Sequence, residues 1–240
     1  MLKLYGHYGS QPFRAVAWLL KIKAKPFEVV KINPLAGEAR TKEYRSKFPL
    51  GLIPALEDTD HTPPFTLSEG SAILIYLCEK YGWNDFYPCS LSTNSDEDNI
   101  TAMKRRAKII EYVSHHNEST RKMTHNVIFP TVKWIFGNDV HSRHDVNDVK
   151  PIVRNIAKRF QHKFLLNKPS GDYIVEGDHP TIVDLMAYED LAQVEMMLGI
   201  QYTEWDELQP LHRWIQKMSE LPYHDDVHRT VYKIGDLYKS

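Results

Sequence analysis

The chain has 240 residues, 42% of them hydrophobic, which is enough for one or two domains with a substantial core. Its 30 Lys and Arg residues are balanced by 31 Asp and Glu residues, and the net charge of -1 argues against nucleic acid or an anionic membrane as a partner. Cys78 and Cys89 form no CxxC pair, so we expect neither a disulfide framework nor a thiol redox motif. Residues 1–20 lack the apolar region of a signal peptide and no run is long enough to cross a membrane, so we expect a cytoplasmic protein.

A strand, a turn and a helix are predicted between Leu2 and Leu20. Leu2 and Leu4 alternate with more polar residues, as in a half-buried strand, and two glycines follow where the chain must reverse. Ser10 then stands directly before a helix whose first turn contains Pro12, a residue whose missing N–H costs nothing there. Because unpaired amides and the helix dipole favour an anion at such a position, the Ser10 hydroxyl is placed where an anion would be stabilised.

The elements predicted next complete the order β-α-β-α-β-β-α over residues 1–82. Ser68 is a suitable N-cap for the last of the helices. In chain order, the further elements are a strand at Phe27–Ile32, a short helix at Glu38–Ser46, a strand at Leu52–Asp58, a return strand at Phe65–Leu67 and a helix at Glu69–Tyr81.

No strand pattern follows Trp83. Ser, Thr, Asn and acidic residues gather over residues 83–97, where we expect a linker, and residues 98–240 are expected to form an all-helical domain. Thr181 and Asp184 form a capping-box pattern before an apolar run. Helical periodicity is found at 98–136, 147–166, 181–198 and 210–219.

Five stretches in this order resemble the glutathione transferase family, and the resemblance spans nearly the whole chain. They are Ser10–Ala15, Ile53–Leu56, Ser68–Ile73, Tyr173–Gly177 and Thr181–Asp184. The first is most similar to the serine-type, theta-like branch. The resemblance implies an α/β thioredoxin-like N-terminal domain, an all-α helical C-terminal domain and a homodimer. It also implies a detoxification enzyme that conjugates glutathione, as co-substrate and without a cofactor, to small hydrophobic electrophiles.

The resemblance gives Ser10 a chemical role. A free thiol has a pKa of about 8.5 and only the thiolate attacks well, so such an enzyme must stabilise a sulfur anion. Ser10 would donate a hydrogen bond to it, aided by the helix dipole. On position alone Ser10 is simply a helix cap, and Tyr8 is the rival donor because other branches use a tyrosine near this point. A serine nucleophile is excluded because the chain has no G-x-S-x-G elbow and no identifiable base for Ser10.

Glutathione itself would be bound by two further stretches. The resemblance implies a cis peptide at Pro54, with the main chain of Ile53 pairing with the cysteinyl part like an added strand; an ordinary trans turn proline is the alternative. Glu69 would accept from the γ-glutamyl ammonium, although an acid also suits the first turn of any helix. The family usually has Ser or Thr after this acid, whereas here Gly70 follows and Ser71 comes one residue later.

Two more positions depart from the family pattern. Leu52 stands where Lys or Gln commonly reaches the glycyl carboxylate, and Ala39 stands where theta-type relatives place a histidine. Arg40 or Lys42 would substitute for the lost contacts. The alternative interpretation is a binding or regulatory protein that keeps the fold but catalyses weakly or not at all.

The electrophile would lie against the helical half. Its predicted wall residues are Tyr112, His116, Arg121, Tyr232 and Tyr238, the last two if the final helix folds over the site; each is alternatively a core or surface residue.

Two histidine pairs suggest a metal site as another interpretation. They are His115 with His116 and His141 with His144. Neither pair has Cys, Asp or Glu nearby at ligand spacing, so no metal site is predicted.

Overall fold

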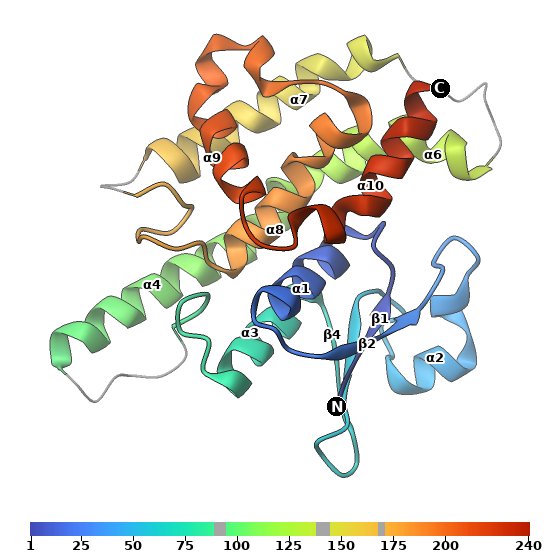
Figure 1. Cartoon of the computed structure of the whole chain (residues 1–240), viewed down its shortest axis with the longest axis vertical. Coiled ribbons are helices and arrows are strands. Elements are labelled where there is room, and N and C mark those ends of the chain that lie inside the picture. The colour runs from blue at the N-terminus through green and yellow to red at the C-terminus, as the bar shows by residue number, and fades with distance from the viewer. Residues whose placement is uncertain (89–94, 138–144, 168–170) are drawn as a thin grey trace.

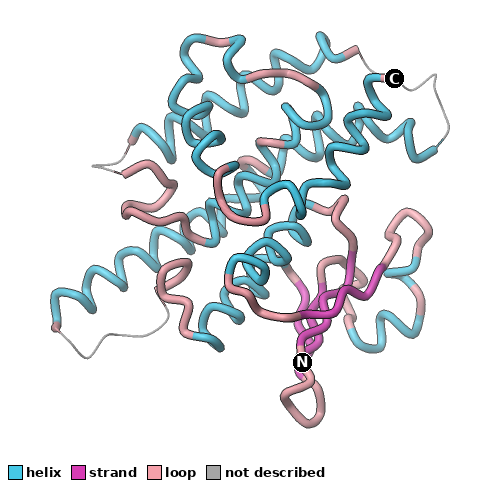
Figure 2. The backbone as a smooth tube through the Cα atoms, in the orientation of Figure 1, coloured by secondary structure: helices cyan, strands magenta, loops and turns pink. Residues whose placement is uncertain are grey.

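A four-stranded sheet forms the N-terminal part of the molecule (Figures 1 and 2), in the strand order β2-β1-β3-β4. β1 pairs in parallel with β2 and antiparallel with β3, which pairs antiparallel with β4. The strands are β1 (Leu2–Gly6), β2 (Phe27–Lys31), β3 (Ala55–Asp58) and β4 (Phe65–Ser68). The computed structural model describes residues 1–88, 95–137, 145–167 and 171–240; Cys89, His141 and His144 lie outside these ranges.

Helices cover both faces of this sheet, as expected for a thioredoxin-like fold. α1 (Gln11–Ile22) and α3 (Gly70–Tyr81) pack on one face, where their apolar residues join those of β1 and β3 in a single core. η1 (Glu38–Arg40) and α2 (Lys42–Lys47) lie on the other face, where a smaller cluster contains Tyr5 and Tyr44.

The rest of the described chain is helical, so the predicted fold class is confirmed. No described helix is both long enough and apolar enough to cross a membrane. The helices are α4 (Asp96–His115), η2 (His116–Glu118), α5 (Arg121–Met123), η3 (Thr124–Ile128), α6 (Phe129–Gly137), α7 (Val146–Phe160), η5 (Gln161–Leu166), α8 (Ile182–Leu191), η6 (Val194–Leu198), η7 (Tyr202–Glu204), η8 (Asp206–Leu208), α9 (Gln209–Ser219) and α10 (His224–Lys239).

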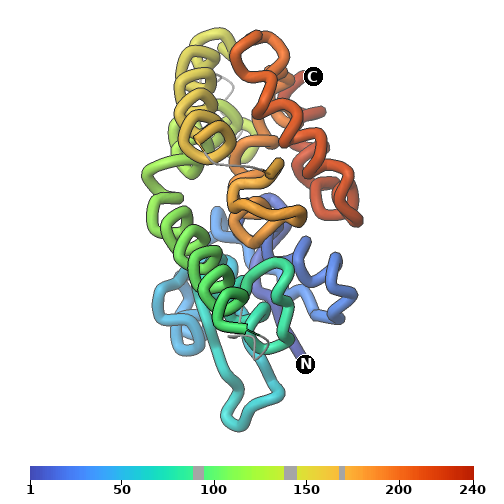
Figure 3. Tube along the Cα trace, turned by 90° about the vertical axis from the view of Figure 1, so that its left-hand side faces the viewer, coloured from blue at the N-terminus to red at the C-terminus, as the bar shows by residue number. Residues whose placement is uncertain are grey.

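Helix α1 lies between the sheet and the helical part, which stack along the long axis of the molecule (Figure 3). Every residue from Phe13 to Leu20 is buried, so α1 has no solvent-facing side over this span. The Trp18 indole N–H donates to the carbonyl of Pro222 at 2.8 Å, which ties α1 to the chain just before α10. The two parts therefore share one hydrophobic core.

Three predicted details of the N-terminal half needed correction. The helix predicted at Glu38–Ser46 divides into η1 and α2, because the Thr41 hydroxyl accepts from the amide of Tyr44 and starts a new helix. The strand predicted from Leu52 begins only at Ala55. Ser68 is not the N-cap of α3: Glu69 takes that place, with a left-handed φ of 74°.

The segment after α3 is packed rather than open. Phe86 and Tyr87 are buried, and the amide of Ile182 donates to the carbonyl of Phe86 at 3.0 Å, so this part of the predicted linker is anchored at the start of α8. α4 begins at Asp96, two residues before the expected position. Residues 89–94 lie outside the described chain, and the predicted domain limits stay predictions.

The predicted capping box at the start of α8 is confirmed. The Asp184 carboxylate accepts from the amide of Thr181 at 2.8 Å. It also accepts from the amide of Ile174 at 2.8 Å and from the indole N–H of Trp214 at 3.1 Å. Burial raises the pKa of Asp184, an effect that these hydrogen bonds oppose. One carboxylate thus fixes α8 relative to α9 and to the loop before it.

Candidate active site

The Ser10 hydroxyl stands at the N-terminus of α1 without capping it. Ser10 has extended backbone angles, and its side chain makes no hydrogen bond to the helix amides. Its own amide donates to the carbonyl of His7 at 3.0 Å, and its carbonyl accepts from the amide of Arg14 at 3.0 Å. The hydroxyl is therefore held at a helix end without being used there, which removes the simple capping interpretation.

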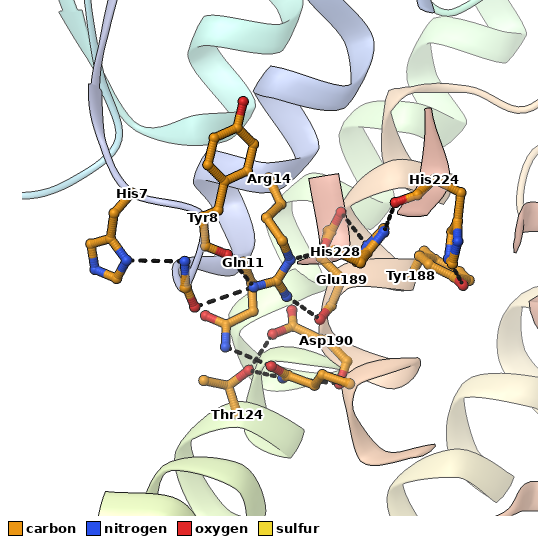
Figure 4. A network of polar contacts seen from close by, with 12 residues as sticks. His7, Tyr8, Gln11, Arg14, Thr124, Tyr188, Glu189, Asp190, His224 and His228 are labelled. Carbon is orange, nitrogen blue, oxygen red and sulfur yellow. Dashed lines mark hydrogen bonds and ion pairs between the residues drawn. The ribbon is translucent and has the colours of Figure 1, made fainter. Parts of the chain in front are cut away.

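Arg14 holds the turn that precedes Ser10 (Figure 4). Its Nη1 donates to the carbonyls of Tyr8 and Gly9 at 3.0 and 3.2 Å. Its Nε pairs with the Glu189 carboxylate, and its Nη2 donates to the Glu189 carbonyl at 3.2 Å. Burial alone would raise the pKa of Glu189, but the charges of Arg14 and His228 lower it, so the carboxylate is ionised.

The two side chains before Ser10 have different orientations. The Gly9 amide donates to Nδ1 of His7 at 3.0 Å, so a neutral His7 ring carries its proton on Nε2. Burial lowers the pKa of His7, and the charge of Arg14 lowers it further. Tyr8 packs edge-on against Phe13, and Figure 4 shows its hydroxyl pointing away from the polar contacts of Arg14. This orientation favours Ser10 over Tyr8 as a donor at the helix end.

The starts of β3 and α3 flank this turn. The Ile53–Pro54 peptide is cis, so that expectation is confirmed, and Ile53 lies before the ladder that begins at Ala55. A Cβ built on Gly6 would stand 3.4 Å from Cβ of Ile53. One on Gly70 would stand 2.8 Å from Cβ of Pro12. Gly70 therefore replaces the usual Ser or Thr at a point where α3 and α1 approach too closely for a side chain.

The loop before Ile53 lies beside η1. A Cβ on Gly51 would stand 3.0 Å from the carbonyl oxygen of Ala39, and the Tyr44 hydroxyl donates to the Leu52 carbonyl at 2.7 Å. Arg40 is exposed next to this contact, whereas Ala39 is buried. Arg40 is thus close in the fold to Leu52, whose side chain is exposed.

A small cavity of about 20 Å³ lies where α1, α3 and the helical part meet, and its lining includes Gly70, Ser71, His116 and Arg121. Arg121 donates to Oε1 of Gln11 at 3.0 Å and pairs with Asp190 at 3.2 Å. Nε2 of His116 lies 3.3 Å from the other Asp190 oxygen.

The other predicted wall residues differ in how far they are buried. Tyr112 is fully buried and its hydroxyl lies 2.7 Å from that of Thr120, so it takes the core position that was the alternative to a substrate wall. Tyr238 is also buried, whereas Tyr232 is partly exposed on α10.

Among the described residues, no three His, Cys, Asp or Glu side chains come together in a way that would hold a metal ion. His115 lies 3.1 Å from Nζ of Lys163, and His116 faces Asp190.

Comparison with known proteins decides the family. Residues 4–85 match the glutathione S-transferase N-terminal domain. Over 210 residues the chain is 30% identical to human glutathione S-transferase theta-2, in an alignment that covers 85% of this chain and 75% of the human protein. The chain belongs to the glutathione S-transferase family. It is also 30% identical to human glutathione S-transferase theta-1, over 79% of this chain and 72% of that protein. A crystal structure of human glutathione transferase theta-2 in complex with glutathione matches with a TM-score of 0.75 and 26% identity, covering 100% of this chain and 90% of that one.

This glutathione transferase is thus an enzyme with theta-like similarity, as the sequence motifs predicted. Sequence reasoning missed the buried polar residues Arg14, Glu189 and His228, which lie behind the Ser10 turn. One sequence signal was present: Arg14 is a charged residue that directly follows the apolar Phe13 in the predicted helix. Its partner Glu189 is 175 positions away, and no local pattern could pair the two.

Replacing Gly70 by Ala should destabilise this glutathione transferase. The added Cβ meets Pro12 at 2.8 Å, and overpacking of this kind costs about 1–3 kcal/mol. Gly137→Ala is the matched control, since a Cβ there meets nothing within 4 Å among the described residues, and it should leave stability unchanged or slightly raised. Urea unfolding measures both, and equal free energies of unfolding would contradict the close approach of α1 and α3.

Proposed function

We propose that this glutathione transferase activates the glutathione thiolate with Ser10 and conjugates it to small hydrophobic electrophiles. The observation that carries the proposal is the Ser10 hydroxyl, which stands at the N-terminus of α1 and is not used as a cap. An anion beside this hydroxyl would also meet the positive end of the α1 dipole. A thiol bound there would have a pKa well below its ordinary value.

The chemistry needs no protein nucleophile. The glutathione thiol loses its proton to solvent, and the thiolate accepts a hydrogen bond from Ser10. The sulfur then forms a bond to the electrophilic carbon, either with departure of a leaving group that takes the bonding electrons or with addition to an activated double bond, which afterwards takes up a proton. The enzyme contributes by keeping the sulfur anionic near neutral pH.

The contacts proposed for glutathione lie around this hydroxyl. The main chain of Ile53, before cis Pro54, pairs with the cysteinyl part. Glu69 has a positive φ of 74°, an unfavourable conformation for a residue with a side chain, and strained residues of this kind cluster at functional sites. Glu69 accepts from the γ-glutamyl ammonium of glutathione. The Gly70 and Ser71 amides at the start of α3 face the carboxylate of the same γ-glutamyl group. Arg40 reaches the glycyl carboxylate in place of the missing polar contacts.

The electrophile is proposed to lie between Ser10 and the helical part, with His116, Arg121 and Tyr232 along its path. Burial lowers the pKa of His116, the charge of Asp190 opposes this shift and that of Arg121 reinforces it, so the imidazole is neutral near pH 7. A neutral imidazole and a partly exposed phenol are compatible with an uncharged, hydrophobic substrate.

A binding protein without efficient catalysis is the second candidate, and two observations favour it. Leu52 presents an exposed apolar side chain at the position of a usual polar contact, and Ala39 is buried, so neither can hold a carboxylate. Retention on immobilised glutathione together with conjugation of a chlorinated nitroaromatic supports the enzyme; a folded protein with neither property supports the second candidate.

A homodimer is proposed from one face of α4. Ile100, Met103 and Ile110 are exposed there at spacings that place them on the same side of the helix. An exposed apolar stripe of this kind marks an interaction surface.

Ser10→Ala should lower the rate of conjugation roughly ten- to hundredfold, because a hydrogen bond to a charged group contributes about 1.5–3 kcal/mol. Tyr8→Phe is the control and should keep the rate, since Figure 4 shows the Tyr8 hydroxyl pointing away from the polar contacts of Arg14. Steady-state kinetics with a chlorinated nitroaromatic test both variants. A Ser10→Ala enzyme with the full rate would contradict the proposed role of Ser10 as the hydrogen-bond donor to the thiolate.

Leu52→Lys should tighten glutathione binding about fivefold by supplying a cation for the glycyl carboxylate, a gain of roughly 1 kcal/mol. Leu50→Lys is the control, because Leu50 is 58% exposed and Leu52 51%, two residues away. Calorimetric titration with glutathione compares them. Equal affinities would show that the carboxylate does not lie near residue 52.

Met103→Glu should convert the dimer to a monomer by placing a charge in the apolar face of α4. Lys108→Gln, an exposed change elsewhere on the same helix, should leave the dimer intact. Sedimentation velocity distinguishes the two forms, and a monomeric wild-type protein would refute the proposed interface.

A further inference from the structure

A chain of buried polar contacts connects the C-terminal helix α10 to the turn before Ser10 (Figure 4). Nε2 of His228 lies 3.1 Å from Oε1 of Glu189. Glu189 pairs with Arg14, and Arg14 donates to the two carbonyls that precede Ser10. The side chains of Arg14, Glu189 and His228 are only 0%, 1% and 1% exposed, so water cannot screen their interactions.

Both ring nitrogens of His228 face hydrogen-bond acceptors. Its Nδ1 lies 2.7 Å from the backbone carbonyl of His224, and its Nε2 lies 3.1 and 3.2 Å from the two carboxylate oxygens of Glu189. A carbonyl and an ionised carboxylate only accept hydrogen bonds. Only an imidazolium, which carries a proton on each ring nitrogen, can donate to both acceptors.

The other groups that face His228 do not compete for this proton. Nε2 of His224 lies 2.7 Å from the Tyr188 hydroxyl, and its Nδ1 lies 2.9 Å from Asp225 at the protein surface. Burial lowers the pKa of His224, and the nearby His228 lowers it further, so His224 is neutral. The Trp18 ring from α1 packs perpendicular to His228 at 5.2 Å and carries no charge.

With His228 in this form, the buried chain holds two cations, Arg14 and His228, on one anion, Glu189. Its net positive charge lies directly behind the turn that carries Ser10. The Glu189 carboxylate is fixed from one side by His228 and from the other by Arg14, and Arg14 in turn fixes the Tyr8 and Gly9 carbonyls. A shift of His228 would be transmitted to the residue next to Ser10.

We propose that His228 is a positioning residue for Ser10, acting through Glu189 and Arg14. The proposal rests on the role proposed above for the Ser10 hydroxyl. His228 keeps the turn in the geometry in which Ser10 donates to the thiolate, and its charge adds to the positive potential there. Both effects stabilise the sulfur anion, and a misplacement of about 1 Å in such a contact is enough to slow a reaction about a hundredfold.

His228→Gln tests the proposal, because Gln can still donate to Glu189 but carries no charge and cannot satisfy both acceptors. We expect kcat about tenfold lower, KM for glutathione within about twofold of wild type and a higher pKa of the bound glutathione thiol. Ultraviolet absorbance of the thiolate, followed against pH in the binary complex, reports that pKa directly. Arg229→Gln is the matched control, one residue along α10 and 71% exposed, and it should change neither quantity.

The double variant Ser10→Ala with His228→Gln separates this proposal from the role of Ser10. If His228 acts mainly through Ser10, adding His228→Gln to Ser10→Ala lowers kcat by much less than the tenfold expected in the wild-type background. Multiplied losses, or an unchanged thiol pKa in His228→Gln while Ser10→Ala is impaired, would overturn the positioning role alone. A full rate in Ser10→Ala would overturn both.

Nitrogen NMR of the wild-type enzyme with labelled histidine covers the case in which His228→Gln fails to fold. A His228 ring with both nitrogens protonated at neutral pH supports the chain of charges. A neutral ring would refute it.

Discussion

The charge of Arg14 must be neutralised inside the protein, and this requirement joins the two halves of the molecule. Arg14 belongs to α1, which is buried on both sides between the sheet and α8. An unpaired guanidinium in such a place would cost several kcal/mol. Its counter-charge, Glu189, comes from the helical half, so the α/β half cannot neutralise the buried charge on its own helix α1. The shared core and this ion pair make the two halves one structural unit.

The same guanidinium organises the site. The Nε of Arg14 pairs with Glu189, and its Nη1 donates hydrogen bonds to the carbonyls of Tyr8 and Gly9. With its neighbouring backbone groups held in this way, Ser10 needs no side-chain hydrogen bond to keep its place. A hydroxyl that is not required for folding remains available for a ligand, and a polar group fixed by packed structure is preorganised for binding.

Local patterns predicted what local interactions determine. The alternation of Leu2 and Leu4, the Pro12 helix start and the Thr181 to Asp184 capping box each depend on residues close in sequence, and each was found. Predictions were less successful where contacts with residues distant in sequence decide the structure. Tyr112 was predicted as a wall residue with a core position as the alternative, and it is enclosed by the helical core because of how distant helices pack. Glu69 displaced Ser68 as the first residue outside α3 because the chain enters this helix with a left-handed turn.

The departures from the family pattern now have different physical meanings. Gly70 is dictated by packing, since α3 approaches Pro12 too closely for any side chain, and Ser71 lines the adjoining cavity one position later. Leu52 has no such reason: its side chain is exposed and only its carbonyl is engaged, by Tyr44. A residue that contributes nothing to packing is free to vary with the ligand. We therefore expect the end of the proposed glutathione site near Leu52 and Arg40 to differ chemically from the family pattern, while the turn that carries Ser10 is held by buried polar contacts.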